Sequence, residues 1–279
     1  MQSLQIKKAS KRNIPIILEF LLKNEFSCIS LVSHVLSFND KDSLYFIYKN
    51  SIPLTANNIT GVILITNYGV ILHSIEKVSK QILFPYFSNL NLFSLAGTIT
   101  GSSMIETLLK KKPSTIFDYD LLTYNYNSPK ISAIRPLLNT FSLKQCSLED
   151  LDKLYFLQYN YQIEEVLPKG KMISERQCRN ILYDRLKKYV VYAIKNEKND
   201  FIAIAGINAI GYNYVQLGGI YTDKRYRNQG LAQNLVRHIV LNSSKKVALF
   251  VKKDNISAQK AYKNVGFEPT FIDYRICYI

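Results

Sequence analysis

The chain has 279 residues, 47% hydrophobic and 20% charged, so it can bury hydrophobic cores and is not disordered by composition. This length is comfortable for two domains. The formal net charge is +15, and the excess is spread over both halves: residues 1–140 carry 14 basic and 8 acidic side chains, the remainder 22 and 13. The distribution favours a solvated basic surface and leaves open the attraction of an anionic partner such as nucleic acid.

Cysteine, histidine and apolar runs indicate an intracellular protein without a metal site. The four cysteines form no CxxC pair, and the three histidines are scattered, which favours reduced thiols. The apolar run at 14–22 follows four basic residues, but Pro15 and Glu19 interrupt it and no small-residue cleavage site follows. The longest apolar stretch, 59–75, is broken at 67–69 and is too short to span a membrane. We expect a cytoplasmic protein.

The first half alternates predicted strands and helices. A helix is expected after the first strand, and a strand-loop-helix unit at 92–111. Strands are expected at 4–8, 44–48, 61–66 and 69–74. Asn-Ser-Pro and Arg135-Pro136 break the pattern between residues 125 and 143. The sequence therefore predicts two domains, at 1–130 and 141–279.

The second half shows a clearer rhythm of elements. Ser147 with Asp150, and Ser174 with Gln177, have the spacing of capping boxes. Helices are expected from residue 148 and at 174–188, 230–242 and 257–265. Strands are expected at 141–145, 190–194, 201–210, 214–222, 246–251 and 271–278. The Gly218-Gly219 pair would admit close approach of a substrate, and a β-bulge is the structural alternative.

A polar loop leads from the predicted strand at 214–222 into the predicted helix at 230–242. A helix N-terminus offers unpaired amides and a partial positive charge, which suit a pyrophosphate. Gly230 lets the backbone approach the phosphate, Ala232 is small, and Arg227 adds a positive charge. The spacing is neither that of a Walker loop nor that of the three-glycine dinucleotide fingerprint. The loop therefore predicts a different phosphate-bearing ligand.

A second motif follows at residues 255–267. Asn255 can cap a helix and Gly266 can end it in a left-handed turn. Ala258 and Tyr262 are four residues apart, so they share one helix face. A core tyrosine would satisfy the same pattern.

These two motifs resemble those of the GNAT superfamily of N-acetyltransferases. The order Arg227-x-x-Gly230-x-Ala232 is similar to its acyl-CoA signature Q/R-x-x-G-x-G/A, and residues 255–267 are similar to its second element. The resemblance implies an α/β fold of the mixed α+β kind, with a mostly antiparallel central sheet flanked by helices. The loosely repeated order of elements implies a degenerate GNAT-like domain at 1–130. That half has Gly97 and Gly101 in a comparable place but no matching Arg or Gln, so no cofactor is expected there.

The resemblance also implies a reaction. Acetyl-CoA would bind as cosubstrate without a metal, and an amine would attack its thioester directly in a ternary complex. Tyr262 would be the general acid, because a phenol can protonate the leaving thiolate. Glu165, with its neighbour Glu164, is a candidate base, and Asn208 and Gln216 are candidates for orienting the acceptor. The implied cofactor-binding residues are Ile220, Tyr221, Thr222, Arg227, Asn228, Gln229, Gly230, Leu231, Ala232, Gln233, Asn255 and Ala258.

Two departures and two alternatives remain. Lys224 stands where relatives often carry proline, and Ala232 replaces the commoner second glycine; neither affects the predicted binding. The alternative to an acetyltransferase is a non-catalytic module that binds acyl-CoA or a partner. A transferase that uses aminoacyl-tRNA is disfavoured, because such proteins tend to lose the CoA signature. The expected acceptor is a small-molecule or peptide amine.

Overall fold

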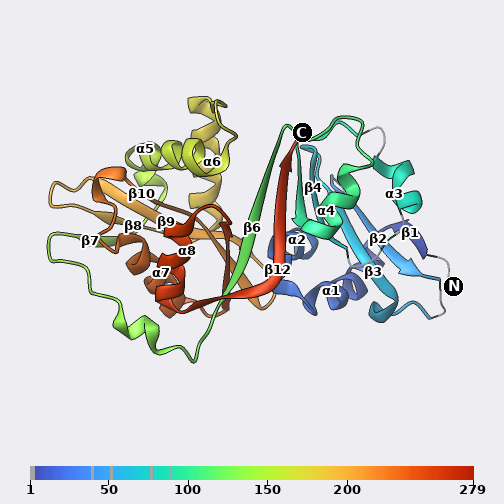
Figure 1. Cartoon of the computed structure of the whole chain (residues 1–279), viewed down its shortest axis with the longest axis horizontal. Coiled ribbons are helices and arrows are strands. Elements are labelled where there is room, and N and C mark those ends of the chain that lie inside the picture. Colours follow the sequence, from blue (N-terminus) through green and yellow to red (C-terminus); the bar gives the residue numbers. More distant parts are fainter. Residues whose placement is uncertain (1–3, 39–40, 51–52, 76–77, 79, 88–89) are drawn as a thin grey trace. The chain divides into compact units, whose positions relative to one another are not determined.

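The computed structural model describes residues 4–38, 41–50, 53–75, 78, 80–87 and 90–279 (Figure 1). The chain forms two compact units. The first comprises residues 1–121, Ile210–Tyr214 and Thr270–Ile279, and the second comprises Leu122–Ala209 and Val215–Pro269. Two short segments of the second half therefore belong to the first unit. The expected domain boundaries, 1–130 and 141–279, stay a prediction.

The first half contains the expected alternation of strands and helices. Its helices are α1 (Ile14–Leu22), α2 (Ile29–Leu36), α3 (Lys80–Phe87) and α4 (Ile99–Glu106). Its strands are β1 (Leu4–Lys8), β2 (Ser43–Lys49), β3 (Ile59–Ile65), β4 (Val70–Ile75), β5 (Ser94–Thr98) and β6 (Thr115–Tyr124). The predicted strands here are confirmed to within two residues. Helices α2 and α3 and strand β6 were not predicted. Pro85 lies inside α3, and proline normally argues against a helix interior.

The second half follows its predicted elements closely. Its helices are α5 (Leu151–Tyr161), α6 (Glu175–Lys188), α7 (Leu231–Asn242) and α8 (Ile256–Val265). Its strands are β7 (Ser142–Gln145), β8 (Val191–Lys195), β9 (Phe201–Ile210), β10 (Tyr214–Thr222), β11 (Lys246–Lys252) and β12 (Phe267–Tyr278). Strands β9 and β10 have the predicted bounds, whereas β12 begins four residues earlier than predicted.

Strand order is that of a mostly antiparallel mixed sheet, as predicted. In the first unit the order is β1-β2-β3-β4-β5-β12. The β4–β5 pair is parallel, and the β1–β2, β2–β3, β3–β4 and β5–β12 pairs are antiparallel. The last strand, β12, pairs with β5 through residues 274–278. In the second unit the order is β11-β10-β9-β8-β7, and β6 is divided between the two units after Leu121. None of the described helices is long and apolar enough to cross a membrane.

Helix pairs cover both faces of the sheet in the second unit. Helices α5 and α6 pack together, as do α7 and α8 (Figure 1). Successive residues of β8 point to opposite faces: Val191 and Ala193 join the apolar cluster under α5 and α6, and Ile194 joins the cluster with α7 and α8. Both apolar faces of the sheet are thus buried, and the carboxyl end of β10 is held between the two layers of helices.

The predicted helix termini are present. Ser174 and Gln177 exchange the two hydrogen bonds of a capping box at α6, each at 3.2 Å. Asn255 Oδ1 accepts a hydrogen bond from the Ala258 amide at the start of α8, at 3.0 Å. Gly266 ends α8 with a φ of 113°. Such caps satisfy backbone groups that a helix cannot pair internally, which explains why these bounds follow from local sequence.

A buried histidine marks the core of the first unit. The His73 ring is 2% exposed and packs on Gly97 and Gly101, where a Cβ atom would lie within 2.5 Å of it. Its Nε2 is hydrogen-bonded to Ser102 Oγ at 3.0 Å, and its Nδ1 has no hydrogen-bond partner among the described residues. Burial lowers the pKa of His73 from 6.5 to about 3. The glycines that resembled a phosphate loop therefore make room for this ring.

The histidine should make the first unit sensitive to acid. The unfolded chain protonates His73 near pH 6.5 and the folded chain only near pH 3, so stability falls as the pH is lowered through this window. Through this group we expect a loss of about 2 kcal/mol between pH 6.5 and about pH 4.5. Urea unfolding at both pH values should show that His73→Phe lacks this loss. An equal pH dependence in both proteins would contradict the assignment.

Candidate active site

The loop between β10 and α7 has the geometry of an anion-binding turn. Asp223 Oδ1 accepts a hydrogen bond from the Arg225 amide at 3.0 Å, and its carboxylate pairs with the Arg225 guanidinium at 2.7 Å. Asn228 and Gly230 then adopt left-handed φ values of 64° and 76°. Left-handed residues next to a helix N-terminus turn successive amides toward one point, a concavity that suits anions. The predicted phosphate loop therefore has a suitable backbone shape.

Arg227, the predicted phosphate partner, is held beside this loop by Glu164. Its Nη2 donates to Glu164 Oε2 at 2.9 Å and its Nε donates to the Thr222 carbonyl at 3.1 Å. Its guanidinium also lies over the Tyr221 ring, 5.5 Å from the centroid. The side chain remains partly exposed. Arg227 is therefore oriented before any ligand arrives, which reduces the entropy lost on binding.

Glu164 is fully engaged and is poorly suited to act as a base. Its carboxylate accepts from the Tyr221 hydroxyl at 2.8 Å and pairs with Lys224 at 3.1 Å, in addition to Arg227. Although burial opposes it, these hydrogen bonds hold the pKa of Glu164 below its ordinary value. A carboxylate with a lowered pKa is a weak proton acceptor. The structure thus separates the two candidate glutamates.

Glu165 has the opposite environment. It lies in a π-helical turn, Gln162–Val166, that follows α5 and was not predicted. Burial raises the pKa of Glu165, and a nearby Lys252 and a 3.3 Å hydrogen bond from Asn255 Nδ2 only partly oppose this. A carboxylate with a raised pKa, at the edge of a cavity, has the properties of a general base.

Tyr262 lies on α8, the helix that Asn255 caps. Its ring is 8% exposed and packs against Phe267 with 6.4 Å between centroids. Burial raises the pKa of the Tyr262 phenol, and Tyr161 and Glu165 add to the effect. The phenol is therefore neutral at physiological pH and able to donate its proton in a hydrogen bond.

The predicted cofactor-binding residues except Gln229, together with Glu165 and Tyr262, line one pocket of about 640 Å³, and Glu164 does not line it. Asn208 and Gln216 do not line it; Asn208 Nδ2 instead occupies the space beside Gly218. Sequence reasoning also missed several lining residues, although helical spacing from Ala258 and Tyr262 would have indicated those on α8. The lining residues are Glu165, Ile220, Tyr221, Thr222, Tyr226, Arg227, Asn228, Gly230, Leu231, Ala232, Gln233, Asn255, Ser257, Ala258, Lys260, Ala261, Tyr262 and Asn264.

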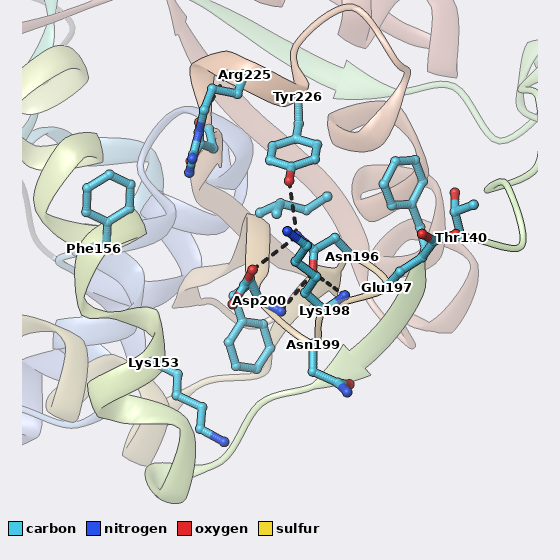
Figure 2. Close-up of a pocket in the computed structure, with 14 residues that line it drawn as sticks. Thr140, Lys153, Phe156, Asn196, Glu197, Lys198, Asn199, Asp200, Arg225 and Tyr226 are labelled. Atoms are coloured by element: carbon cyan, nitrogen blue, oxygen red, sulfur yellow. Dashed lines mark hydrogen bonds and ion pairs between the residues drawn. The ribbon is translucent and has the colours of Figure 1, made fainter.

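A second hollow lies at the turn between β8 and β9 (Figure 2). It measures about 740 Å³, and Asn196 at its centre donates to the Tyr226 hydroxyl at 3.0 Å and to Asp200 at 3.3 Å. Its charged lining residues are three bases and three acids: Lys153, Lys198, Arg225, Glu197, Asp200 and Asp223. Although this hollow is the larger, its charges balance. The pocket at the start of α7 is the better candidate because the left-handed loop at Asn228 and Gly230 lines it together with Arg227 and Lys260.

Among the described residues, no group of three or more His, Cys, Asp or Glu side chains is placed to hold a metal ion. The four cysteines are buried and free.

A family model matches most of the second half of the chain. Residues 148–267 match the model of the acetyltransferase (GNAT) family. No curated protein sequence is significantly similar to the chain.

Solved structures resemble the whole chain. A Drosophila protein has a TM-score of 0.65 at 10% identity, covering 99% of both chains. A GCN5-related N-acetyltransferase from Sphaerobacter thermophilus has a TM-score of 0.59 at 8% identity, covering 98% of this chain and 94% of the other. A tandem GNAT protein from the clavulanic acid biosynthesis pathway has a TM-score of 0.58 at 9% identity, covering 98% of both. At such identities these likenesses establish the fold. Residues 148–267 are therefore a domain of the acetyltransferase (GNAT) family, in a chain whose first half also shares the fold of tandem GNAT proteins.

Proposed function

We propose that the second unit binds acetyl-CoA in the pocket at the start of α7 and transfers the acetyl group to an amine. The observation that carries this proposal is the convergence of two distant motifs, the loop before α7 and the capped face of α8, on one pocket. The loop supplies amides and Arg227 for the pyrophosphate, and α8 supplies Tyr262 beside the position of the sulfur. Binding alone would not need the hydroxyl of Tyr262.

The reaction follows from the chemistry of the lining residues. An amine in its neutral form attacks the thioester carbonyl, the new C–N bond forms, and the C–S bond breaks to release CoA. Glu165 accepts the proton lost by the amine, and the Tyr262 hydroxyl donates a hydrogen bond to the departing thiolate. Backbone amides of β10 residues near Ile220 support the negative charge that develops on the carbonyl oxygen.

A ligand screen by thermal unfolding tests the binding. Acetyl-CoA, longer acyl-CoAs and free CoA should each be added to the whole protein at hundredfold excess over their Kd. We expect acetyl-CoA to stabilise it by about 2.7 kcal/mol, a rise in Tm of roughly 5–10 °C. No rise with any of these compounds would contradict the proposal. Release of free thiol with an amine panel then separates an enzyme from a binding module.

Gly230→Val should reduce the rise in Tm by about half or more. Gly230 has a φ of 76°, which a side chain strains, and a valine would stand where the phosphate approaches. We expect acetyl-CoA affinity at least about tenfold weaker. Gly170→Val is the matched control, because Gly170 has a φ of 79° but lies in open space. Equal loss of affinity in both variants would show that backbone strain, not the phosphate loop, caused it.

Glu165→Gln should change the pH dependence of transfer. The base must be ionised, and burial raises the pKa of Glu165, so kcat/KM should fall as the pH is lowered through that raised value. We expect the variant to lose this acid limb and to have a plateau about a hundredfold lower. Glu149→Gln, an exposed glutamate, is the control. With the concentration of neutral amine held constant at each pH, an acid limb that persists in Glu165→Gln would assign the base elsewhere.

A further inference from the structure

An arginine is buried inside the second unit without a carboxylate partner. Arg185, on α6, is 7% exposed, and its Nη2 donates to the Gly218 carbonyl at 2.6 Å. No acidic side chain pairs with it among the described residues, and its Nε has no hydrogen-bond partner among them. Burial lowers the pKa of Arg185, and the Tyr161 and Cys146 side chains only partly oppose this. Burying an unpaired cation is costly, so a purely space-filling role is a poor explanation.

Glycines make the space that this guanidinium occupies. A Cβ atom on Gly219 would lie 1.9 Å from Arg185 Nη1, and one on Gly206 would lie 2.9 Å from Nη2. Gly219 also has a left-handed φ of 58° within strand β10. A left-handed glycine inside a strand is typical of a β-bulge. The bulge and the arginine therefore depend on each other.

Two side chains hold the peptide unit at this bulge from opposite ends. Arg185 binds the carbonyl of Gly218, and the Tyr161 hydroxyl accepts a hydrogen bond from the Gly219 amide at 3.3 Å. Tyr161 ends α5 and Arg185 belongs to α6. The peptide between the two glycines is thus fixed by both helices that cover this face of the sheet.

The fixed peptide directly precedes the strand segment that lines the pocket. Ile220, Tyr221 and Thr222 follow Gly219 and all three line it. Consecutive peptides are linked by φ and ψ, and a strand confines both angles to the β region, so the orientation of one peptide limits that of the next. A rotation at the bulge would turn the amides of this segment away from the pocket.

We propose that Arg185 and Tyr161 are positioning residues for acetyl transfer, which fix the Gly218–Gly219 peptide and thereby aim the β10 amides at the thioester carbonyl. This inference rests on the proposed function. Neither side chain touches the reacting atoms; both act through the main chain. Amides that are oriented in advance stabilise a developing oxyanion without reorganising during the reaction.

The carbonyl stretching band of acetyl-CoA labelled with ¹³C at the thioester carbonyl reports this orientation without any acceptor. Bound to the whole wild-type protein, the band should shift to lower wavenumber than in free acetyl-CoA. We expect Arg185→Met and Tyr161→Phe to lose more than half of this shift, and Arg185→Lys to lose less, since lysine keeps one charged donor. Arg179→Met is the matched control, because Arg179 lies on the same helix and pairs with Asp152 and Glu175 at the surface. A full shift in folded Arg185→Met would overturn the proposal.

With an acceptor found in the amine panel, steady-state kinetics give a second measurement. We expect kcat to fall at least about tenfold in Arg185→Met, while KM for acetyl-CoA stays within about threefold. A change confined to KM, or to thermal stability, would indicate a structural role and overturn the proposal.

Hydrogen exchange separates failure of this inference from failure of the proposed function. In the protein without ligand, the Gly219 amide should exchange at least about tenfold faster in Tyr161→Phe and Arg185→Met than in Arg179→Met. If Arg185→Met does not fold, Tyr161→Phe and Arg185→Lys carry the test. Equal exchange in all variants would show that Arg185 and Tyr161 do not fix the Gly218–Gly219 peptide, even if acetyl-CoA binds. Faster exchange in Tyr161→Phe and Arg185→Met, with no acetyl-CoA binding by the wild type, would show that the two side chains fix the peptide but would contradict the proposed function. The positioning role in acetyl transfer would then be wrong as well.

Discussion

Glu25→Ala is expected to lower the free energy of unfolding by about 3 kcal/mol. Glu25 is 1% exposed and belongs to a short 3₁₀ turn, Glu25–Ser27, in the first unit. Its carboxylate accepts hydrogen bonds from the Asn213 amide at 2.9 Å, the Asn213 side chain at 2.9 Å and the Tyr214 amide at 3.2 Å. Removing it leaves three donors without their acceptor, and a buried donor without a partner costs about 1–3 kcal/mol.

The tip of the β9–β10 hairpin packs tightly against the Glu25 carboxylate. A Cβ atom on Gly211 would lie 2.2 Å from Glu25 Oε1, so the hairpin tip is shaped around this carboxylate. Urea unfolding measures the loss. Glu25→Gln keeps the shape and one acceptor and should lose less, while Glu19→Ala, an exposed glutamate on α1, should stay within about 0.5 kcal/mol of the wild type. Equal stability of the Glu25 and Glu19 alanine variants would contradict the prediction.

Tyr262→Phe is expected to lower kcat about a hundredfold and to leave acetyl-CoA binding nearly unchanged. Burial raises the pKa of this phenol, so full proton transfer before the C–S bond breaks is unfavourable. The hydroxyl instead donates a hydrogen bond to negative charge as it develops on sulfur, an interaction made mainly in the transition state. Such interactions change kcat more than KM. The phenylalanine ring retains the packing against Phe267.

Steady-state rates across a range of pH, with thiol release as the signal, measure this effect. Tyr183→Phe is the control, since Tyr183 is exposed on α6 and lines neither pocket described above. Thermal unfolding of Tyr262→Phe should show that the fold is intact. A kcat equal to that of the wild type at every pH would remove Tyr262 from the mechanism.

Local sequence determined the elements and the pocket walls of the second unit. Ser174 caps α6 with Gln177, and Asn255 caps α8 with Ala258; in each cap the two residues are three positions apart. Apolar periodicity is also visible within a few helical turns or one strand. The same holds for the loop before α7, whose shape depends on Gly230. These features are set by hydrogen bonds and dihedral angles inside a short segment. That is why a single sequence sufficed to place them.

The sequence could not assign the two glutamates at the end of α5. They are adjacent, and neither has a local partner that distinguishes them. Glu164 is neutralised by Arg227, 63 positions away, whereas Glu165 meets Asn255, 90 positions away. The unpredicted π-helical turn that carries both changes the directions of their side chains. Their proton affinities therefore depend on the tertiary surroundings, through burial and charge.

By itself, the sequence determined the GNAT-like order of elements in the second half, the loop before α7 and the capped start of α8. The tertiary structure alone decided three other features: the seat of Arg185 on glycines, the hydrogen bonds between Glu25 and the tip of the β9–β10 hairpin, and the pairing of β12 with β5. Each of these joins residues at least 20 positions apart in the chain. Burial and hydrogen bonding between distant segments leave no periodic or local trace in a single sequence, since their stabilisation arises only when the chain closes the intervening loops.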